Sequence, residues 1–252
     1  GNLPVLRKKR NHTMETILHK AATRGHFDHG WLQTYHTFSF ANYYDPARVN
    51  FGALRVLNDD VVAPGTGFGM HPHRDMEIVT VPLHGTLEHE DCMGHASAIR
   101  PGEIQVMTAG TGIYHSEYAE KGDTPAELLQ IWVIPDRRNL SPRYENATVA
   151  GLVRRGEICT VVSPYPGDGH GLWIHQQAWF SLAEMDRDTR TAYTMKSGDS
   201  YGVYAFMIEG EANIAGTDLS HRDGLGISGT DSFEIYAVGD ARILLIEVPE
   251  VE

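Results

Sequence analysis

The sequence has little cysteine, little positive charge and no long apolar run, and each shortage excludes a class of protein. Its two cysteines, Cys92 and Cys159, are too few for a disulfide framework, which favours a reducing, cytoplasmic location. No stretch approaches the roughly 20 apolar residues that a membrane-spanning helix needs, and no secretory signal pattern is recognisable. We therefore expect a cytoplasmic protein that does not contact a membrane.

Positive charge is scarce as well. The 252 residues include 33 acidic and 21 basic side chains, which gives a formal net charge of −12. Such a surface repels phosphate backbones, so direct nucleic-acid binding is not expected. A short basic run at 7–10 precedes Met14, and we expect residues 1–13 to be a tag remnant or an upstream extension outside the fold.

Short apolar or alternating segments are abundant and are separated by clusters of Gly, Pro, Asp and Asn. These turn signals return about every 8–12 residues, and no convincing long amphipathic helix lies between them. The pattern predicts an all-β fold built from sandwiches or barrels. The expected strands are 53–57, 77–82, 85–89, 104–107, 128–134, 160–163, 173–181, 201–208, 212–214, 233–237 and 243–248.

An internal repeat indicates that the same scaffold occurs twice. A strand, a turn at Gly85, a second strand and a turn at 101–102 are repeated later with turns at Gly210 and 223–224. Repetition of this length is typical of tandem domains, so we expect two similar β-barrels in one chain.

Two short segments each carry a pair of metal-capable side chains. His71 and His73 form one pair, and His115 and Glu117 form the other. Residues i and i+2 of a strand share a face, so each pair would present two ligands together. If the two strands face one another across a barrel, all four groups can close on one ion. Three imidazoles and one carboxylate suit a transition metal such as iron, copper, nickel, manganese or zinc.

The repeat confines this site to the first barrel. At the equivalent positions the second barrel has residues that cannot in practice replace a metal ligand: Lys196, Gly198, Ala237 and Gly239. We therefore expect an N-terminal, metal-binding barrel at 14–142 and a degenerate C-terminal barrel at 143–252, with 135–142 as the linker.

The same segments carry a family resemblance. Gly65, His71-Pro-His73, Glu77 and Gly85 fit the first cupin motif, and 108–117 fits the second loosely. Beyond cupins at large, the chain resembles the pirin family, in its bacterial quercetin 2,3-dioxygenase-like branch. The blocks that carry this resemblance are 30–46, 71–77 and 108–117.

The resemblance implies a bicupin with one metal ion in the N-terminal barrel, held by His71, His73, His115 and Glu117. In cupins generally the glutamate of the first motif is a ligand. Glu77 is therefore the alternative fourth ligand, or a group that orients an imidazole. The expected ion is one divalent transition metal, iron first, with nickel, copper, cobalt, manganese or zinc as the alternatives.

Quercetinase-like members of this family open the central ring of flavonols with O2. The resemblance therefore implies a flavonol-like aromatic substrate that chelates the metal, with Glu117 as the general base that accepts the 3-hydroxyl proton. The alternative is a metal- or redox-responsive binding protein, a co-regulator that contacts a protein partner without physiological catalysis.

A flat aromatic substrate needs an apolar slot beside the ligands. We expect the segment 36–40 and Phe68 to line it. The full set of candidate wall residues is Phe38, Phe40, Phe51, Phe68, Met70, Met107 and Trp132. Other histidines, including His84, His89 and His95, are expected to be exposed or hydrogen-bonded rather than to bind metal.

Overall fold

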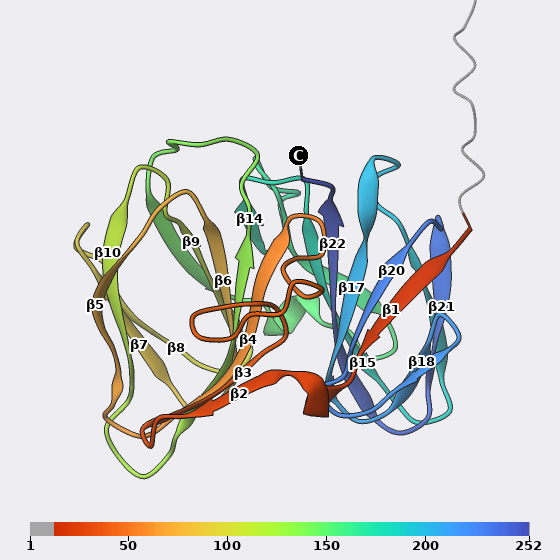
Figure 1. The fold of residues 1–252 in the computed structure, drawn as a ribbon, viewed down its shortest axis with the longest axis horizontal. Coiled ribbons are helices and arrows are strands. Elements are labelled where there is room, and N and C mark those ends of the chain that lie inside the picture. The colour runs from red at the N-terminus through yellow and green to blue at the C-terminus, as the bar shows by residue number, and fades with distance from the viewer. Residues whose placement is uncertain (1–12, 252) are drawn as a thin grey trace, which may run out of the picture.

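Strands dominate the described part of the chain, residues 13–251 of a computed structural model, which confirms the all-β prediction (Figure 1). The only helical elements of this part are two short 3-10 helices, Ala21–Thr23 and Ala150–Leu152. Within these residues no helix is long and apolar enough to span a membrane. The expected extension 1–13 lies outside the described residues except for Thr13.

The first barrel is a seven-stranded sheet packed on a four-stranded one. The large sheet has the order β12-β9-β6-β11-β4-β3-β2, and the small sheet has the order β5-β10-β7-β8. The bounds of the large sheet are β2 Gly25–Asp28, β3 Leu32–His36, β4 Leu54–Val62, β6 Glu77–His84, β9 Glu103–Thr108, β11 Ala126–Val133 and β12 Arg143–Thr148. Those of the small sheet are β5 Gly67–His73, β7 Leu87–Asp91, β8 Ala96–Ile99 and β10 Ile113–Ala119.

The second barrel repeats this arrangement. Its large sheet has the order β1-β20-β17-β22-β15-β13-β14, and its small sheet has the order β16-β21-β18-β19. The large-sheet strands are β1 Glu15–His19, β13 Ile158–Pro164, β14 Leu172–Ile174, β15 Trp179–Met185, β17 Ser200–Glu209, β20 Gly224–Ser228 and β22 Ala241–Pro249. The small sheet holds β16 Arg190–Thr194, β18 Ala212–Ile214, β19 Thr217–Leu219 and β21 Ser232–Ala237.

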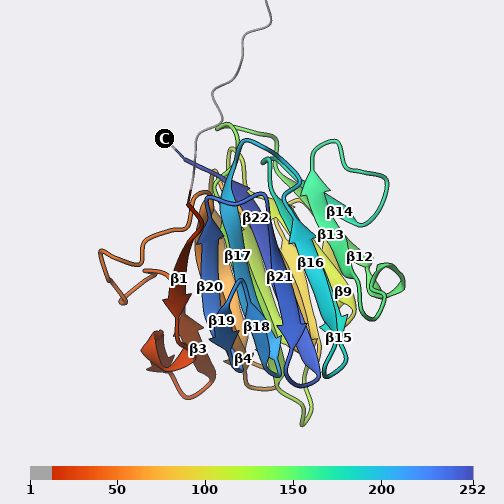
Figure 2. The same ribbon diagram turned by 90° about the vertical axis from the view of Figure 1, so that its right-hand side faces the viewer.

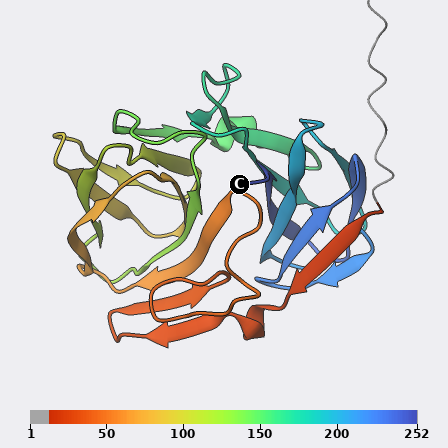
Figure 3. The ribbon, with the colours of Figure 1, turned by 45° about the horizontal axis from the view of Figure 1, so that its top comes forward.

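The two large sheets face each other at the centre of the molecule, and the small sheets lie outside (Figures 1 and 3). The largest apolar cluster joins the barrels there, with Leu54 and Ile131 of the first barrel and Phe180 and Leu244 of the second all fully buried. Continuous apolar runs such as β22 suit this position, because both of their faces are covered.

The two barrels differ in their interiors. A single apolar cluster that includes Tyr193, Met207 and Ala237 fills the second barrel. The interior of the first barrel has only two small apolar clusters, one around Leu87 and Leu128 and one of Ile78, Met107, Ala109 and Ile113. The first barrel therefore leaves room for polar groups between its sheets.

Two strands do not follow the expected boundary at 142/143. β1 pairs with β20 of the second barrel, with Glu15 opposite Ser228, and Figure 2 shows it along that edge. β12 pairs with β9 of the first barrel, with Arg143 opposite Thr108. The ranges 14–142 and 143–252 therefore misplace these two strands, because an edge strand joins whichever open sheet edge its backbone reaches.

Buried ion pairs also connect the barrels. The carboxylate of Asp59 on β4 accepts from Arg24 at 2.8 Å and from Arg222 of the second barrel at 3.0 Å. Arg222 also contacts Glu209 at 3.2 Å. The side chains of Arg24, Asp59 and Arg222 are 7%, 12% and 11% exposed, so water screens these charges little.

Asp59→Asn should lower the free energy of unfolding by about 3–5 kcal/mol, because it leaves two guanidinium groups without their buried counter-charge. Denaturant unfolding measures this change. Glu157→Gln is the matched control, since its ion pair with Arg154 is exposed and should be worth little. Equal midpoints for the wild type and Asp59→Asn would contradict the role of this network.

The pH dependence of stability should reveal the docking of β1. Burial lowers the pKa of His19 from 6.5 to about 4, and its Nδ1 lies 2.9 Å from the hydroxyl of Tyr204. As the pH falls below 6.5, the imidazole of His19 binds a proton in the unfolded state but stays neutral in the folded state until the pH approaches 4. His19 should therefore cost about 1–2 kcal/mol of stability at pH 5 relative to pH 7. His19→Gln should remove that part of the pH dependence in denaturant titrations, whereas the exposed control His170→Gln should follow the wild type.

Candidate metal centre

The two predicted ligand pairs lie on adjacent strands of the small sheet. β5 and β10 are hydrogen-bonded antiparallel neighbours, with His71 directly opposite His115. The two strands therefore do not face one another across the barrel, which was the condition considered above for closing the four groups on one ion. A register shift follows His115, so that Glu117 pairs with Phe68 instead of Gly69. Direct pairing brings the side chains of His71 and His115 as close as the expected arrangement would have done.

Three imidazoles converge at this pairing. One ring nitrogen from each of His71, His73 and His115 lies within 4.8 Å of the others, which makes this a group that could hold a metal ion. The two Nε2 atoms of His71 and His73 are 3.0 Å apart. The Nδ1 atom of His71 contacts the carbonyl of Gly69 at 2.6 Å. If Nδ1 carries the proton, the Nε2 of His71 presents a lone pair to the site, as in ligating histidines.

Burial keeps the imidazoles of His73 and His115 neutral. Burial first, and the neighbouring imidazoles second, lower the pKa of His73 to about 4 and that of His115 to about 3. A neutral imidazole is the form that binds a metal ion, so at neutral pH both rings are ready to act as ligands.

His115 and Glu117 hold buried atoms without protein partners. Their side chains are 1% and 2% exposed, and Glu117 Oε1 lies 3.5 Å from His115 Nε2. Gln130 Nε2 donates to the same Oε1 at 3.0 Å. Among the described residues, neither ring nitrogen of His115 nor Glu117 Oε2 finds a hydrogen-bond partner. Leaving such groups unpaired costs about 1–3 kcal/mol each, and a bound cation would satisfy the ring nitrogen of His115 that carries the lone pair and the carboxylate of Glu117. The donor set therefore fits a metal ion.

Glu77, the alternative ligand, is occupied elsewhere. Its buried carboxylate accepts from the backbone N–H of His175 at 2.7 Å and contacts the Nδ1 of the same residue at 2.6 Å. His175 lies in the second barrel, beyond β14. The structure thus uses this glutamate to join the barrels and does not bring it to the three histidines.

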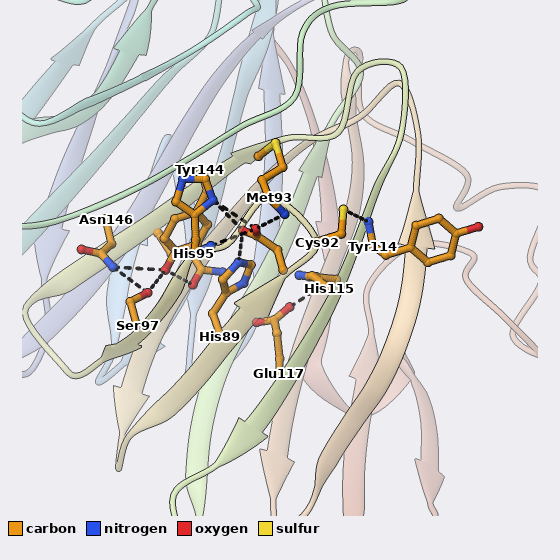
Figure 4. A network of polar contacts seen from close by, with 12 residues as sticks. His89, Cys92, Met93, His95, Ser97, Tyr114, His115, Glu117, Tyr144 and Asn146 are labelled. Carbon is orange, nitrogen blue, oxygen red and sulfur yellow. Dashed lines mark hydrogen bonds and ion pairs between the residues drawn. The ribbon is translucent and has the colours of Figure 1, made fainter.

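A second polar network adjoins His115, seen from close by in Figure 4. The carboxylate of Asp91 lies 2.7 Å from His89 Nε2 and 2.9 Å from His95 Nδ1. The His89 ring stacks on Tyr144 at 4.0 Å and lies 5.3 Å from the ring of His115. His89 and His95 are thus hydrogen-bonded, as expected, and they pack behind the candidate ligands.

His71, His73 and Glu117 line a cavity of about 410 Å³ inside the first barrel, whereas His115 is not among its lining residues. Of the expected wall residues, Phe40, Phe68 and Trp132 line it. The others do not: Phe38, Phe51 and Met107 pack in apolar clusters, and Met70 is 57% exposed. Sequence reasoning missed several lining residues: Trp31, Thr34, Asn58, Asp60 and Gln130. A signal was present for two of them, because 58–60 is a polar run between the apolar residues 56–57 and 61–62 of strand β4.

Comparisons with known proteins agree with this architecture of two cupin barrels. The Pirin family model matches residues 17–133, and the Quercetinase C-terminal cupin domain matches 160–248. Quercetin 2,3-dioxygenase of Escherichia coli (strain K12) is 42% identical over 93% of this chain and 99% of its own. The fold is therefore that of a bicupin.

Solved structures give the same result. The crystal structure of YhhW from Escherichia coli has a TM-score of 0.88 and 41% identity, and covers 94% of this chain and 99% of its own. The same bacterial pirin in complex with nickel(II) has a TM-score of 0.87 and 40% identity, and covers 94% of this chain and all of its own. The chain belongs to the pirin family, and its bacterial members named quercetin 2,3-dioxygenase are among its relatives.

Metal content distinguishes the two candidate glutamates. After loading and dialysis, His115→Gln and Glu117→Gln should each retain about one tenth or less of the nickel or iron that the wild type retains. The reason is that each variant loses a donor. Glu77→Gln should retain the metal but unfold at lower denaturant, because it loses a contact between barrels. Elemental analysis measures the metal, with the exposed His84→Gln as control. Full metal retention by His115→Gln would refute the site.

Proposed function

We propose that this pirin is a metal-dependent dioxygenase that opens the heterocycle of flavonols with O2. The observation that carries the proposal is that His71, His73 and Glu117 line a cavity of about 410 Å³ at the point where the ring of His115 converges on the other two imidazoles. Glu117 Oε2 has no hydrogen-bond partner among the described residues. The 42% identity to a bacterial protein named quercetin 2,3-dioxygenase supports the choice of substrate.

We propose His71, His73, His115 and Glu117 as the ligands of one divalent transition metal. When bound, the ion would supply Lewis-acid chemistry and hold a chelating substrate oxygen. Iron and nickel are the first ions to test. Iron is the ion that the sequence leads us to expect, and the nickel(II) complex of a relative at 40% identity supports nickel. The ligand types suit either ion.

Glu117 is proposed as the base that accepts the proton of the flavonol 3-hydroxyl. Its carboxylate lines the cavity, and Gln130 holds Oε1 at 3.0 Å while Oε2 has no partner among the described residues. An oriented carboxylate can take a proton, through an oxygen that the metal leaves free, from a hydroxyl group that comes within hydrogen-bond reach.

Aromatic side chains shape the cavity for a flat ligand. Phe40 and Trp132 meet edge to face at 5.3 Å, and Trp132 lies 5.1 Å from the ring of His73. Trp31 and Phe68 form a second edge-to-face pair at 5.2 Å. Such walls bury the apolar faces of a polyphenol and exclude water from the reacting end.

The metal-loaded protein should consume quercetin and O2, seen as loss of flavonol absorbance and uptake of oxygen. Glu117→Gln should lower kcat by about 10²–10⁴-fold, because the amide cannot accept the proton. His84→Gln is the control. No turnover with iron, nickel, copper, cobalt or manganese would refute the dioxygenase proposal and favour the binding-protein alternative.

A further inference from the structure

The wall of the cavity formed by the large sheet carries polar side chains that the proposed metal centre does not use. Thr34 and His36 on β3, and Asn58 and Asp60 on β4, line the cavity. The strand register places Thr34 opposite Asp60 and His36 opposite Asn58. These four residues thus form one patch, called here the β3–β4 patch, on a different sheet from the candidate ligands.

The patch is buried but not satisfied. Its members His36, Asn58 and Asp60 are 3%, 5% and 4% exposed. Among the described residues, His36 Nδ1 and Asn58 Oδ1 find no hydrogen-bond partner. Buried polar groups are almost always paired, so unpaired ones on a cavity wall indicate a ligand or water that is bound there.

Asp60 adds a carboxyl group to the patch. Its Oδ1 accepts the hydroxyl of Thr34, and no hydrogen bond of the described residues reaches Oδ2. Burial raises the pKa of Asp60 to about 7, with smaller contributions from Asp59 and Glu117. A carboxyl group with one oxygen that no protein group reaches can pair with a hydroxyl group in the cavity.

The cavity thus has polar groups on both sheets. Gln130 lies between them, because it is opposite Asn58 in the strand register and donates a hydrogen bond to Glu117. On the small sheet, His71, His73 and Glu117 would hold the metal-chelating end of a substrate. On the large sheet, the β3–β4 patch has room for further polar groups on the same molecule. An unsubstituted aromatic ring would leave the buried acceptors of the β3–β4 patch unpaired, whereas a hydroxylated ring would satisfy them.

We propose that Asn58 and Asp60 form a hydroxyl-recognition subsite, which selects aromatic substrates that carry a hydroxyl group outside the metal-chelating unit. This inference rests on the proposed function and narrows its substrate class to polyhydroxylated compounds. Asn58 and Asp60 are specificity-determining residues in this account, while proton transfer stays with Glu117.

Two flavonols test the subsite, because both chelate a metal but only one has hydroxyl groups outside the chelating unit. Quercetin carries several hydroxyls outside the chelating unit, and 3-hydroxyflavone carries none. Equilibrium binding to the metal-loaded protein is followed by quenching of Trp31 and Trp132, which line the cavity. Turnover of each compound is measured in parallel, so that binding and catalysis are separate readouts.

Asp60→Asn and Asn58→Ala should each weaken quercetin binding by about tenfold or more and leave the affinity for 3-hydroxyflavone within about twofold. Asp223→Asn is the matched control, since Asp223 is equally buried but lies in the second barrel. It should leave both affinities unchanged. KM for quercetin should rise with the dissociation constant, while kcat changes little.

Equal weakening of both flavonols, or no weakening of either, would overturn the subsite and would assign the patch to bound water. That outcome leaves the dioxygenase proposal intact if the wild type turns over quercetin. Conversely, a protein that binds quercetin more tightly than 3-hydroxyflavone through Asp60, but turns over neither, would retain the subsite and refute the dioxygenase.

Discussion

The pairing of His71 with His115 across the β5–β10 ladder is the contact on which the candidate site depends. Directly opposed residues of an antiparallel pair have Cβ atoms about 5 Å apart, so this register alone brings two imidazoles into range of one ion. His73 joins them because it lies two residues along the same strand. A shift of one residue would turn these side chains to the outer face and destroy the site.

The two barrels show what such a site requires of its surroundings. The second barrel encloses one continuous apolar cluster, in which Ala237 stands where the repeat would place a ligand. The first barrel has two small clusters, and the space between its sheets holds the histidines, Glu117 and the β3–β4 patch. Much of its packing energy therefore comes from outside the barrel, through the apolar cluster that both large sheets share.

Much of this architecture was predictable from local patterns. Turn spacing predicted an all-β chain, the repeat predicted two barrels, and alternation along a strand put His71 and His73 together. Asn58 and Asp60 were missed because 58–60 reads as a turn, so the predicted strand ended at 57 although β4 continues to Val62. Alternation gives this run two roles: Asp59 points to Arg24 and Arg222, whereas Asp60 faces the cavity. Which partner each carboxyl finds depends on segments far away in sequence, so local reasoning cannot supply it.

The exchange of edge strands has a consequence for how the chain can fold and be divided. β1 precedes β2 to β22 in the chain but pairs with β20, about 200 residues later, so its docking is among the most non-local contacts of the described residues. A cut after residue 142 would leave β1 in the first fragment and its partner β20 in the second. The same cut would leave β9 in the first fragment and its partner β12 in the second. Each half would then expose a sheet edge that invites pairing with another chain. The two barrels resemble independent domains in outline, yet each needs a strand from the other's stretch of sequence to be complete.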